Sequence, residues 1–562
     1  MGSDVIPHRH AVAVHLDLQR SRHTPEPNVP RPRPTRRSRT APDGNTFATT
    51  TNPDKRAAWF GSPAGASAAS GLPVEPYPGV LDHVMGNGVE AVYGAGVGGG
   101  SLVFGSFTPV PRRQDFEHIF PAAADYAQLA QTYFPRAKAG LGVSPLPADI
   151  LAHPKYVGAR SWLKVIERYG ASPHFFDFAI DWDIVRDELA GRATPSVTAG
   201  ELSYGVNSGA KKSLDRSYLL AAERTGNVTV KPMHEVFDIR PRSRRAGFVV
   251  TARVLDEQGR TVRTVTTEAD HLFMDAGSFH TTRLLVEARA QGRLPRLSPR
   301  IGDGFGVNGD FLTIRANPRE DFGAVQGGPG YARIYEDNLP GGPVSMVYQA
   351  TPLPAPLGKA ATTHLVQAHT DERGTIDYDH RTRRAQLNYP HPADRNDLDR
   401  RSNAFIKRFH ERTEGRFGFA ANGTHVSSRA LGFGSASTYH GLGGVVMGAA
   451  ADADGGIRGY DNLWVVDGSF VPGAVGLVNP ALTITALAER TMDRFLATHL
   501  GTAKSDTTLG YCDSQHPERA LDTVVRGGHP LRHEERHSCF LESSRNPPPT
   551  SRPSSGPLPA RY

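Results

Sequence analysis

The sequence predicts a mixed α/β protein in which strands alternate with helices. Residues 248–255 and 261–267 are two strand-like runs separated by a glycine-containing turn, which is the pattern of a β-hairpin. A short apolar run at 271–274 follows, then a glycine turn and a helical stretch at 281–291. Farther along, residues 479–496 show the apolar face of an amphipathic helix. These three observations indicate the fold class.

Both ends of the chain are predicted to be disordered. Residues 1–41 are rich in Arg, Pro and His, and residues 503–562 contain three consecutive prolines among scattered Ser and Arg. The net charge is +7, but residues 1–41 hold eight Arg against three acidic residues, and the C-terminal tail holds eight basic and seven acidic residues. The part between them is nearly neutral. Nucleic-acid binding, which rests on the basic N-terminus alone, is therefore the weakest hypothesis.

Cysteine usage and hydropathy exclude several other classes. Cys512 and Cys539 are the only two cysteines and both lie in the C-terminal tail, so the sequence predicts neither a disulfide framework nor a metal site. No run approaches the roughly 20 apolar residues of a membrane span. The first thirty residues show no secretory signal, and the localisation stays open, with the cytoplasm as the default.

A glycine run at residues 94–99 satisfies the G-x-G-x-x-G pattern and follows a predicted short strand at 91–93. A dinucleotide fingerprint also needs a helix directly after the loop and an acidic residue about 20 positions on. Pro109 and Pro111 follow here, so we expect no crossover helix. We interpret the run as a loop whose backbone closely approaches a flat ring or a phosphate, with a plain glycine-rich turn as the alternative.

The most informative block begins at Tyr439 and extends into the last predicted helix. It contains the imidazole of His440, several glycines, and a short apolar strand that ends at Asp467. Asn479 occupies a predicted N-cap, and Pro480 follows at the first helical position. The start of this helix carries a partial positive charge that suits a developing anion. Alternatively, the histidine and the asparagine are ordinary structural residues.

This block resembles the C-terminal signature of the glucose-methanol-choline (GMC) flavin oxidoreductases, especially bacterial cholesterol oxidases with non-covalent flavin. Their histidine lies in a Tyr-His-x-Leu-Gly-Gly run and their asparagine in a Val-Asn-Pro run before the last helix, which correspond to His440 and Asn479. The resemblance covers residues 42–500. Its further motifs, in the family's order, are NPDKR at 52–56, GVGGGSLV at 96–103, KSLD at 212–215 and AGS at 276–278.

The resemblance implies an FAD-binding domain of the GMC type interleaved with a substrate domain built on an antiparallel sheet. The predicted segments are 42–114, 203–309 and 434–500 for the FAD-binding domain, and 115–202 and 310–433 for the substrate domain. The family's dinucleotide fingerprint is expected upstream of these segments, but residues 1–41 do not contain it. We therefore expect the domain to lack its first βαβ unit and, for that reason, to bind FAD weakly. An altered reading frame would explain why the segment with the fingerprint is missing.

The resemblance also implies a reaction. FAD would take a hydride from a secondary alcohol and O2 would reoxidise it, with the 3β-hydroxyl of cholesterol or a related sterol as substrate. His440 would act as the base or hydrogen-bond partner of the hydroxyl, and Asn479 would orient the substrate oxygen or stabilise the reduced flavin. The positions that match cofactor contacts of the family are Gly100, Phe104, Gly105, Phe107, Val236, Gly468 and Ala481. The expected form is a monomer that contacts a membrane surface transiently to extract its substrate.

The sequence departs from the family pattern at several of these positions. Phe104 and Phe107 stand where the family commonly has Asn and Met, and the loop at 475–479 has one extra residue, which we expect to displace Asn479. Gln349 occupies the place of the carboxylate that shifts the ring double bond, so we expect weak or absent isomerase activity. Two alternatives therefore stay open: oxidation of a non-steroid alcohol, and a flavin-free remnant without activity.

Overall fold

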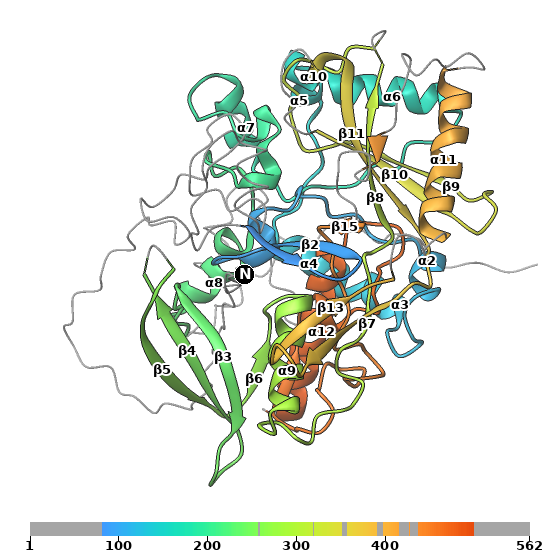
Figure 1. Ribbon diagram of the computed structural model, residues 1–562. Helices are drawn as coiled ribbons and strands as arrows, with labels where there is room; N and C mark the ends of the chain where they lie inside the picture. The colour runs from blue at the N-terminus through green and yellow to red at the C-terminus, as the bar shows by residue number, and fades with distance from the viewer. Residues whose placement is uncertain are drawn as a thin grey trace, which may run out of the picture. The chain divides into compact units, whose positions relative to one another are not determined.

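The protein has a mixed α/β fold, as predicted (Figure 1). The computed structural model describes residues 81–256, 259–317, 320–350, 357–390, 397–414, 426–427 and 436–499. All of them belong to one compact unit. The predicted disordered tails, both cysteines and the motif at 52–56 lie outside the described residues. The domain boundaries stay a prediction.

A five-stranded antiparallel sheet forms one half of the described fold. Its order is β14-β8-β11-β10-β9. The strands are β8 (Asp310–Ala316), β9 (Arg333–Glu336), β10 (Val344–Gln349), β11 (Ala361–Ala368) and β14 (Val426–Ser427). Helices α6 (Val157–Tyr169) and α11 (Asp397–Glu414) lie together against this sheet (Figure 1). Trp162 of α6 packs its ring 4.6 Å from that of His364 on β11 and 5.9 Å from that of Phe409 on α11.

The predicted hairpin and the strand, turn and helix after it are confirmed. β4 (Phe248–Leu255) pairs antiparallel with β5 (Thr261–Ala269) and with β3 (His234–Pro241), which completes a three-stranded meander. β6 (Leu272–Met274) follows and leads through Gly277 into α9 (Ser278–Ala290). β6 pairs in parallel with β16 (Leu463–Val465), the strand predicted near the end of the chain.

The glycine run does not open a helix, which confirms the expectation from the sequence. β2 (Val89–Gly94) is followed by η1 (Gly99–Leu102), a short 3-10 turn. β2 pairs antiparallel with β1 (Leu81–Met85) and in parallel with β15 (Ala436–Thr438). A further small sheet consists of β7 (Asp303–Phe305), β12 (Gly374–Asp379) and β13 (Arg384–Asn388).

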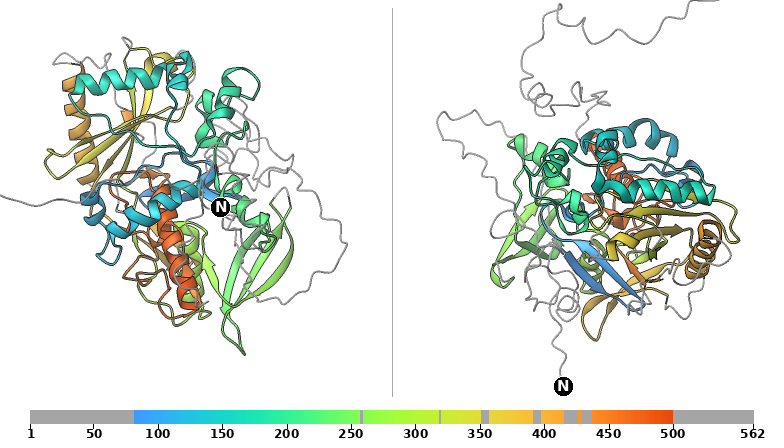
Figure 2. Two further views of the ribbon diagram at one scale, coloured as in Figure 1. Left: turned by 180° about the vertical axis from the view of Figure 1, so that it is seen from behind. Right: turned by 90° about the horizontal axis from the view of Figure 1, so that it is seen from above.

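Short helical segments connect these sheets. They are α2 (Arg113–Glu117), α3 (Tyr126–Gln128), η2 (Leu129–Tyr133), α4 (Phe134–Gly140), α5 (Ala148–Ala152), η3 (Pro154–Tyr156), α7 (Trp182–Leu189), η4 (Val197–Ala199), η5 (Glu201–Tyr204), η6 (Leu214–Arg216), α8 (Tyr218–Arg224), α10 (Leu357–Ala360) and η9 (Gly468–Phe470). The last helix, α12 (Ala481–His499), lies beside α4 (Figure 2). Arg136 of α4 ties them together, since its guanidinium lies 2.7 Å from carboxylate oxygens of both Glu489 and Asp493. None of the described helices is long and apolar enough to span a bilayer.

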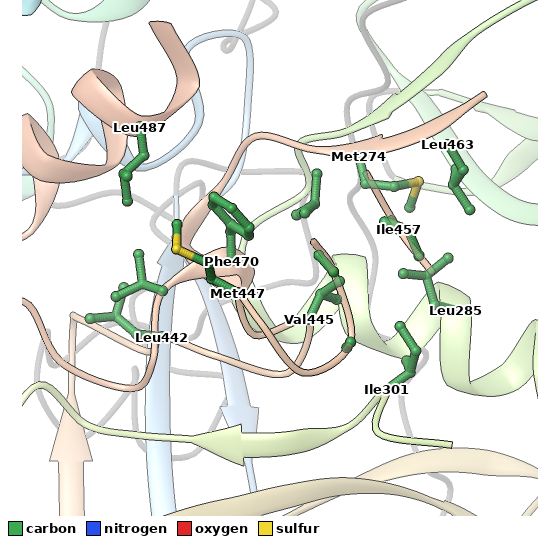
Figure 3. Close-up of a cluster of buried hydrophobic side chains, with 14 of the residues drawn as sticks. Met274, Leu285, Ile301, Leu442, Val445, Met447, Ile457, Leu463, Phe470 and Leu487 are labelled. Carbon is green, nitrogen blue, oxygen red and sulfur yellow. The ribbon is translucent and has the colours of Figure 1, made fainter. Parts of the chain in front are cut away.

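The largest cluster of buried apolar side chains surrounds the C-terminal block. Leu442, Val445, Met447 and Phe470 of that block gather with Leu285 of α9 (Figure 3). The same cluster includes side chains from β6, β16 and α12. Because apolar burial contributes about 25 cal/mol per Å2, this shared cluster fixes the segment around His440 against both helices.

Gly309 provides a test of how closely the backbone packs next to β8. Its φ is +69°, and an added Cβ would lie 1.9 Å from the carbonyl oxygen of Ala368. Gly292 is a matched control, because its φ is +71° but an added Cβ would meet nothing within 4 Å. We expect Gly292→Ala to cost about 1 kcal/mol of unfolding free energy, and Gly309→Ala to cost at least about 2 kcal/mol more. Urea unfolding measures both, and equal costs would contradict the packing described here.

Candidate active site

Two pairs of parallel strands bring together sequence motifs that lie far apart in the chain. β2 and β15 run side by side with Ala91 opposite Thr438, so the chain leaves both strands at the same edge. The glycine run therefore begins at the same edge from which His440 emerges. In open α/β sheets, ligands bind at the carboxyl ends of parallel strands, and this edge is such a place.

The second parallel pair joins the AGS motif at 276–278 to the C-terminal block. After β6, the backbone N–H of Gly277 donates to Asp467 Oδ2 at 2.8 Å, and Ser278 Oγ donates to the carbonyl of Gly443 at 2.7 Å. The KSLD motif contacts the glycine run, because the N–H of Leu214 donates to Ser101 Oγ at 2.8 Å. Motifs separated by more than a hundred residues thus share one region of the structure.

His440 lies against a buried carboxylate. Its Nδ1 is 2.8 Å from Asp310 Oδ2, at the start of β8, although the ring is not aligned for a linear hydrogen bond. Thr438 Oγ1 donates to the same carboxylate oxygen at 3.0 Å and accepts the backbone N–H of His440 at 2.8 Å. The side chain of His440 is 18% exposed, whereas that of Asp310 is 4% exposed. The imidazole is therefore held on one side and accessible on the other.

Asn479 is held by a buried guanidinium. Arg333 Nη2 donates to Asn479 Oδ1 at 2.7 Å, and Arg333 Nη1 lies 2.7 Å from the carbonyl oxygen of Leu477 and 2.6 Å from Ser345 Oγ. Among the described residues, no carboxylate lies within ion-pair distance of Arg333. Burial lowers the pKa of Arg333, against the opposing effects of Tyr335 and Asp310. Buried charges normally have such a partner, so this arrangement is unusual.

Gln367 on β11 connects these two parts. Its Nε2 donates to Asp310 Oδ1 at 3.1 Å, and its Oε1 accepts from Arg333 Nη1 at 2.7 Å. A continuous path of polar contacts thus runs from His440 through Asp310, Gln367 and Arg333 to Asn479. The structure brings the two residues that carried the sequence prediction into one network.

The loop before Asn479 contains an unusual backbone conformation. Leu477 has a φ of +62°, which is in the left-handed region that side chains other than glycine disfavour by roughly 1–2 kcal/mol. Its carbonyl oxygen accepts from Ser345 Oγ at 2.8 Å as well as from Arg333. This is the loop in which the resemblance implies one extra residue. Contacts from the sheet hold the strained residue in place.

The glycine-loop residues lie at the edge described above. Gly100 is exposed in η1, and a Cβ there would meet nothing within 4 Å, so its backbone faces open space. Phe104 is half-buried, with Lys211 Nζ 5.5 Å from its ring centroid. Gly105 approaches the ring of Phe107, to which a Cβ would come within 2.3 Å. Phe107 itself is buried against Phe178, with ring centroids 6.0 Å apart.

The other predicted contacts are placed on different elements. Gly468 begins η9, where a Cβ would lie 3.1 Å from Leu442. Ala481 is the first residue of α12, and Val236 is buried in β3 within the largest apolar cluster. Gln349 is the last residue of β10 and lies on the same face of the strand as Ser345. The two are four residues apart, which corresponds to about 13 Å along the strand. Placement alone does not test the predicted roles of these residues, which stay predictions.

Sequence reasoning assigned no role to Asp467, which connects the two glycine turns. Its Oδ2 accepts from Gly277 and from Thr281 Oγ1, the latter at 2.5 Å, while its Oδ1 accepts the N–H of Ser469 at 2.8 Å. The apolar strand that ends in Asp-Gly-Ser was a signal for such a cap. Arg333, Gln367 and Asp310 gave no comparable signal, since isolated polar residues usually lie at the surface.

Two accessible side chains near this region are nevertheless desolvated. Tyr439 is 57% exposed, yet burial raises its pKa. Asp275 is also exposed, but burial and then the charge of Asp467 raise its pKa to about 8. In both cases burial of the ionisable group disfavours its charged form and raises its pKa.

These residues fit one end of an extended flavin cofactor. The open backbone at Gly99 and Gly100 allows a flat ring to approach, and the accessible Tyr439 adjoins His440 at the same edge. The fit does not extend to the adenosine end. In the part of the chain that the structure describes, no G-x-G-x-x-G loop leads into a helix, because η1 follows the glycine run and the first α-helix begins at Arg113. The described residues also contain no cluster of three or more metal-ligating side chains.

Comparisons with known proteins define the class of this site. Residues 370–488 match the model of the GMC oxidoreductase family, in its C-terminal part. This segment contains both His440 and Asn479. This part of the chain is therefore similar to the C-terminal part of GMC oxidoreductases, the family that its motifs resemble.

Curated relatives give a more specific likeness. The chain is 30% identical over 264 residues to a cholesterol oxidase of Mycobacterium tuberculosis (strain CDC 1551 / Oshkosh), covering 42% of this chain and 43% of that protein. It is 23% identical over 481 residues to a cholesterol oxidase of Acinetobacter baumannii, covering 73% of this chain and 82% of that protein. The match thus spans less than half of the mycobacterial relative.

A solved structure supports the fold. Pyridoxine 4-oxidase from Mesorbium loti is similar to this protein with a TM-score of 0.50 and 16% identity, over 76% of this chain and 88% of that one. At this identity the likeness concerns the fold alone. It agrees with the mixed α/β architecture described above.

The raised pKa of Asp275 gives the structure a specific pH dependence. Because the folded protein binds this proton more tightly than the unfolded chain, the associated stability is lost as the pH rises from about 4 toward about 8. In Asp275→Asn the amide stays neutral at every pH, so the variant does not lose this stability as the pH rises. The melting temperature of the variant minus that of the wild type should therefore increase between pH 5 and pH 8.5. Asp275→Ala should show the same pH trend. A difference that is constant with pH would contradict the desolvation of this carboxyl.

Proposed function

We propose that this protein is an FAD-dependent alcohol oxidase of the GMC type that uses O2 and acts on a hydrophobic secondary alcohol. The 3β-hydroxyl of cholesterol or a related sterol is the first candidate substrate. The polar network that joins His440 to Asn479 at the edge of the glycine loop is the observation that carries this proposal. The relatives named cholesterol oxidase support the choice of substrate class.

His440 is suited to accept the hydroxyl proton. Its Nδ1 faces Asp310, so Nε2 is the ring atom left for the substrate. Imidazole titrates nearest to neutral pH among the side chains, and a positioned base of this kind contributes about 10² to 10⁴ in rate. When bound, FAD supplies the acceptor for the hydride.

Asn479 is suited to donate to the substrate oxygen. A guanidinium has donors only, so its contact with Asn479 requires the amide oxygen on the side of Arg333. The NH2 group of the carboxamide is then directed elsewhere. A donor fixed in this way stabilises negative charge that develops on an alcohol oxygen, and the nearby cation strengthens the effect.

The sheet face beyond this network is apolar and packed. Val347 and Leu365 lie opposite each other between the polar row at Ser345 and the position of Gln349. Both are buried in a cluster that includes Phe107.

A non-steroid hydrophobic alcohol is the second candidate. The ring of Phe107 lies directly over the backbone of Gly105, and it occupies space that the family's Met would fill differently. This observation favours a pocket whose shape departs from that of a sterol oxidase. The remnant hypothesis rests on the missing fingerprint and predicts a protein that does not retain FAD.

Reduction of the flavin tests the function directly. The purified full chain, supplied with FAD, is mixed with each alcohol of a panel of sterols and simple alcohols. Without oxygen, the substrate should reduce the flavin and bleach its absorption. In air, the same mixture should release H2O2. His440→Gln should lower kcat by at least about 100-fold, because the base is lost. His499→Gln, at the end of α12, is the matched control and should retain activity. A protein that stays colourless with excess FAD would refute the proposal and favour the flavin-free remnant without activity.

Gln349 allows a test of the isomerase step. The wild-type protein should release the unconjugated ketone as its first product, since an amide cannot shuttle a proton. Gln349→Glu restores a carboxylate and should increase the fraction of conjugated ketone, measured by its ultraviolet absorption in the first turnovers. Gln386→Glu on β13 is the matched control. Rapid conjugation by the wild type would refute the assignment of this position.

A further inference from the structure

Asp310 is held by hydrogen bonds at both of its carboxylate oxygens. Oδ2 faces His440 Nδ1 and accepts from Thr438 Oγ1, while Oδ1 accepts from Gln367 Nε2 at 3.1 Å and from Asn308 Nδ2 at 3.4 Å. These donors come from β15, β11 and the turn before β8. The carboxylate is buried and cannot rotate without losing several of these contacts at once.

These contacts also determine which atoms carry protons. Thr438 Oγ1 accepts the backbone N–H of His440, and of the two acceptors near its hydroxyl, Asp310 Oδ2 at 3.0 Å is closer than the carbonyl oxygen of Val307 at 3.4 Å. The carboxylate of Asp310 is an acceptor, and His440 Nδ1 lies 2.8 Å from its Oδ2 with the ring tilted away from a linear hydrogen bond, so this contact favours a proton on Nδ1. The imidazole then has its proton on Nδ1, and Nε2 has a free lone pair.

We propose that Asp310 is the positioning residue that sets the tautomer of His440 and, through Gln367 and Arg333, the orientation of Asn479. This inference deepens the proposed function and rests on it. Nε2 would accept the hydroxyl proton, and FAD, when bound, would supply the acceptor for the hydride of the carbinol carbon, so that the alcohol would lose two electrons and two hydrogens and become a ketone. Asp310 keeps its negative charge throughout and stabilises the imidazolium that forms.

Charge balance supports the same role. Arg333 is buried without a carboxylate in ion-pair distance among the described residues, and the carboxylate nearest to it in the network is that of Asp310, one amide away. Protonation of His440 adds a second positive charge beside the same carboxylate. One negative group thus serves two cations, and its loss would leave both uncompensated in a buried site.

The tautomer is directly measurable. In the full chain supplied with FAD and labelled with 15N at histidine, the His440 resonances are assigned from the spectrum of His440→Gln. The wild type should show Nδ1 protonated and Nε2 unprotonated. Asp310→Asn should invert this pattern, because the carboxamide NH2 can donate to Nδ1 and favours the form with its proton on Nε2.

Kinetics provide the second readout. Asp310→Asn should lower kcat by at least about 100-fold and change KM by less than about threefold, because the wrong tautomer removes the base without removing the binding surface. Asp303→Asn on β7 is the matched control, since this carboxylate pairs with Arg300 at the surface, 3.2 Å away. The control should preserve both the tautomer and kcat.

The outcomes separate this inference from the proposed function. An inverted tautomer in a protein that oxidises no alcohol would support the role of Asp310 and refute the function. Oxidation that is unchanged in Asp310→Asn would refute the role and leave the function standing. If the variant does not fold, the wild-type spectrum still decides, because a proton found on Nε2 of His440 overturns the inference.

Discussion

The guanidinium of Arg333 holds together the loop on which the candidate site depends. From the first position of β9, it binds the carbonyl of Leu477 and the carboxamide of Asn479, and it reaches Ser345 and Gln367 on the neighbouring strands. Burying a cation without a carboxylate partner is expensive, and hydrogen bonds to a charged donor, each worth about 1.5–3 kcal/mol, offset that cost here. Any substitution that removes the charge leaves several buried acceptors without their donor, so the loop and the sheet depend on each other.

Parallel strand pairing determines where the other half of the site lies. β15 contributes only three residues, yet its pairing with β2 places His440 at the edge where the glycine run begins. The pairing of β6 with β16 does the same for the turns joined by Asp467. Both pairs involve strands separated by more than 180 residues in the chain. Two apolar clusters supply the stabilisation that such short strands cannot provide themselves. One contains Val89 and Ala91 of β2, and the other contains side chains of β6 and β16.

Periodicity and turn residues in the sequence predicted those elements that form from residues close together in the chain. The hairpin of β4 and β5, the helix α9 after its glycine turn, and α12 after Pro480 all follow from periodicity and turn chemistry. His440 and Asn479 were found through the resemblance of their flanking motifs. Asp310 and Arg333 could not be found in this way, because each begins a strand whose partners are set by non-local antiparallel pairing. A single charged residue at a strand end has the same local pattern whether it is exposed or buried, and only the assembled sheet distinguishes the two.

The loop before Asn479, in which the resemblance implies one extra residue, shows how the sheet and the loop are matched. A longer loop would normally displace the carboxamide, and small displacements are costly at a reacting centre. Here Leu477 turns the backbone through the left-handed region, and the guanidinium on β9 binds the chain on both sides of Val478. The strained residue and the buried cation therefore act together: the turn takes up the additional length, and the charge fixes the position of the amide that follows. Contacts from β9 therefore fix the position of Asn479 together with its own loop.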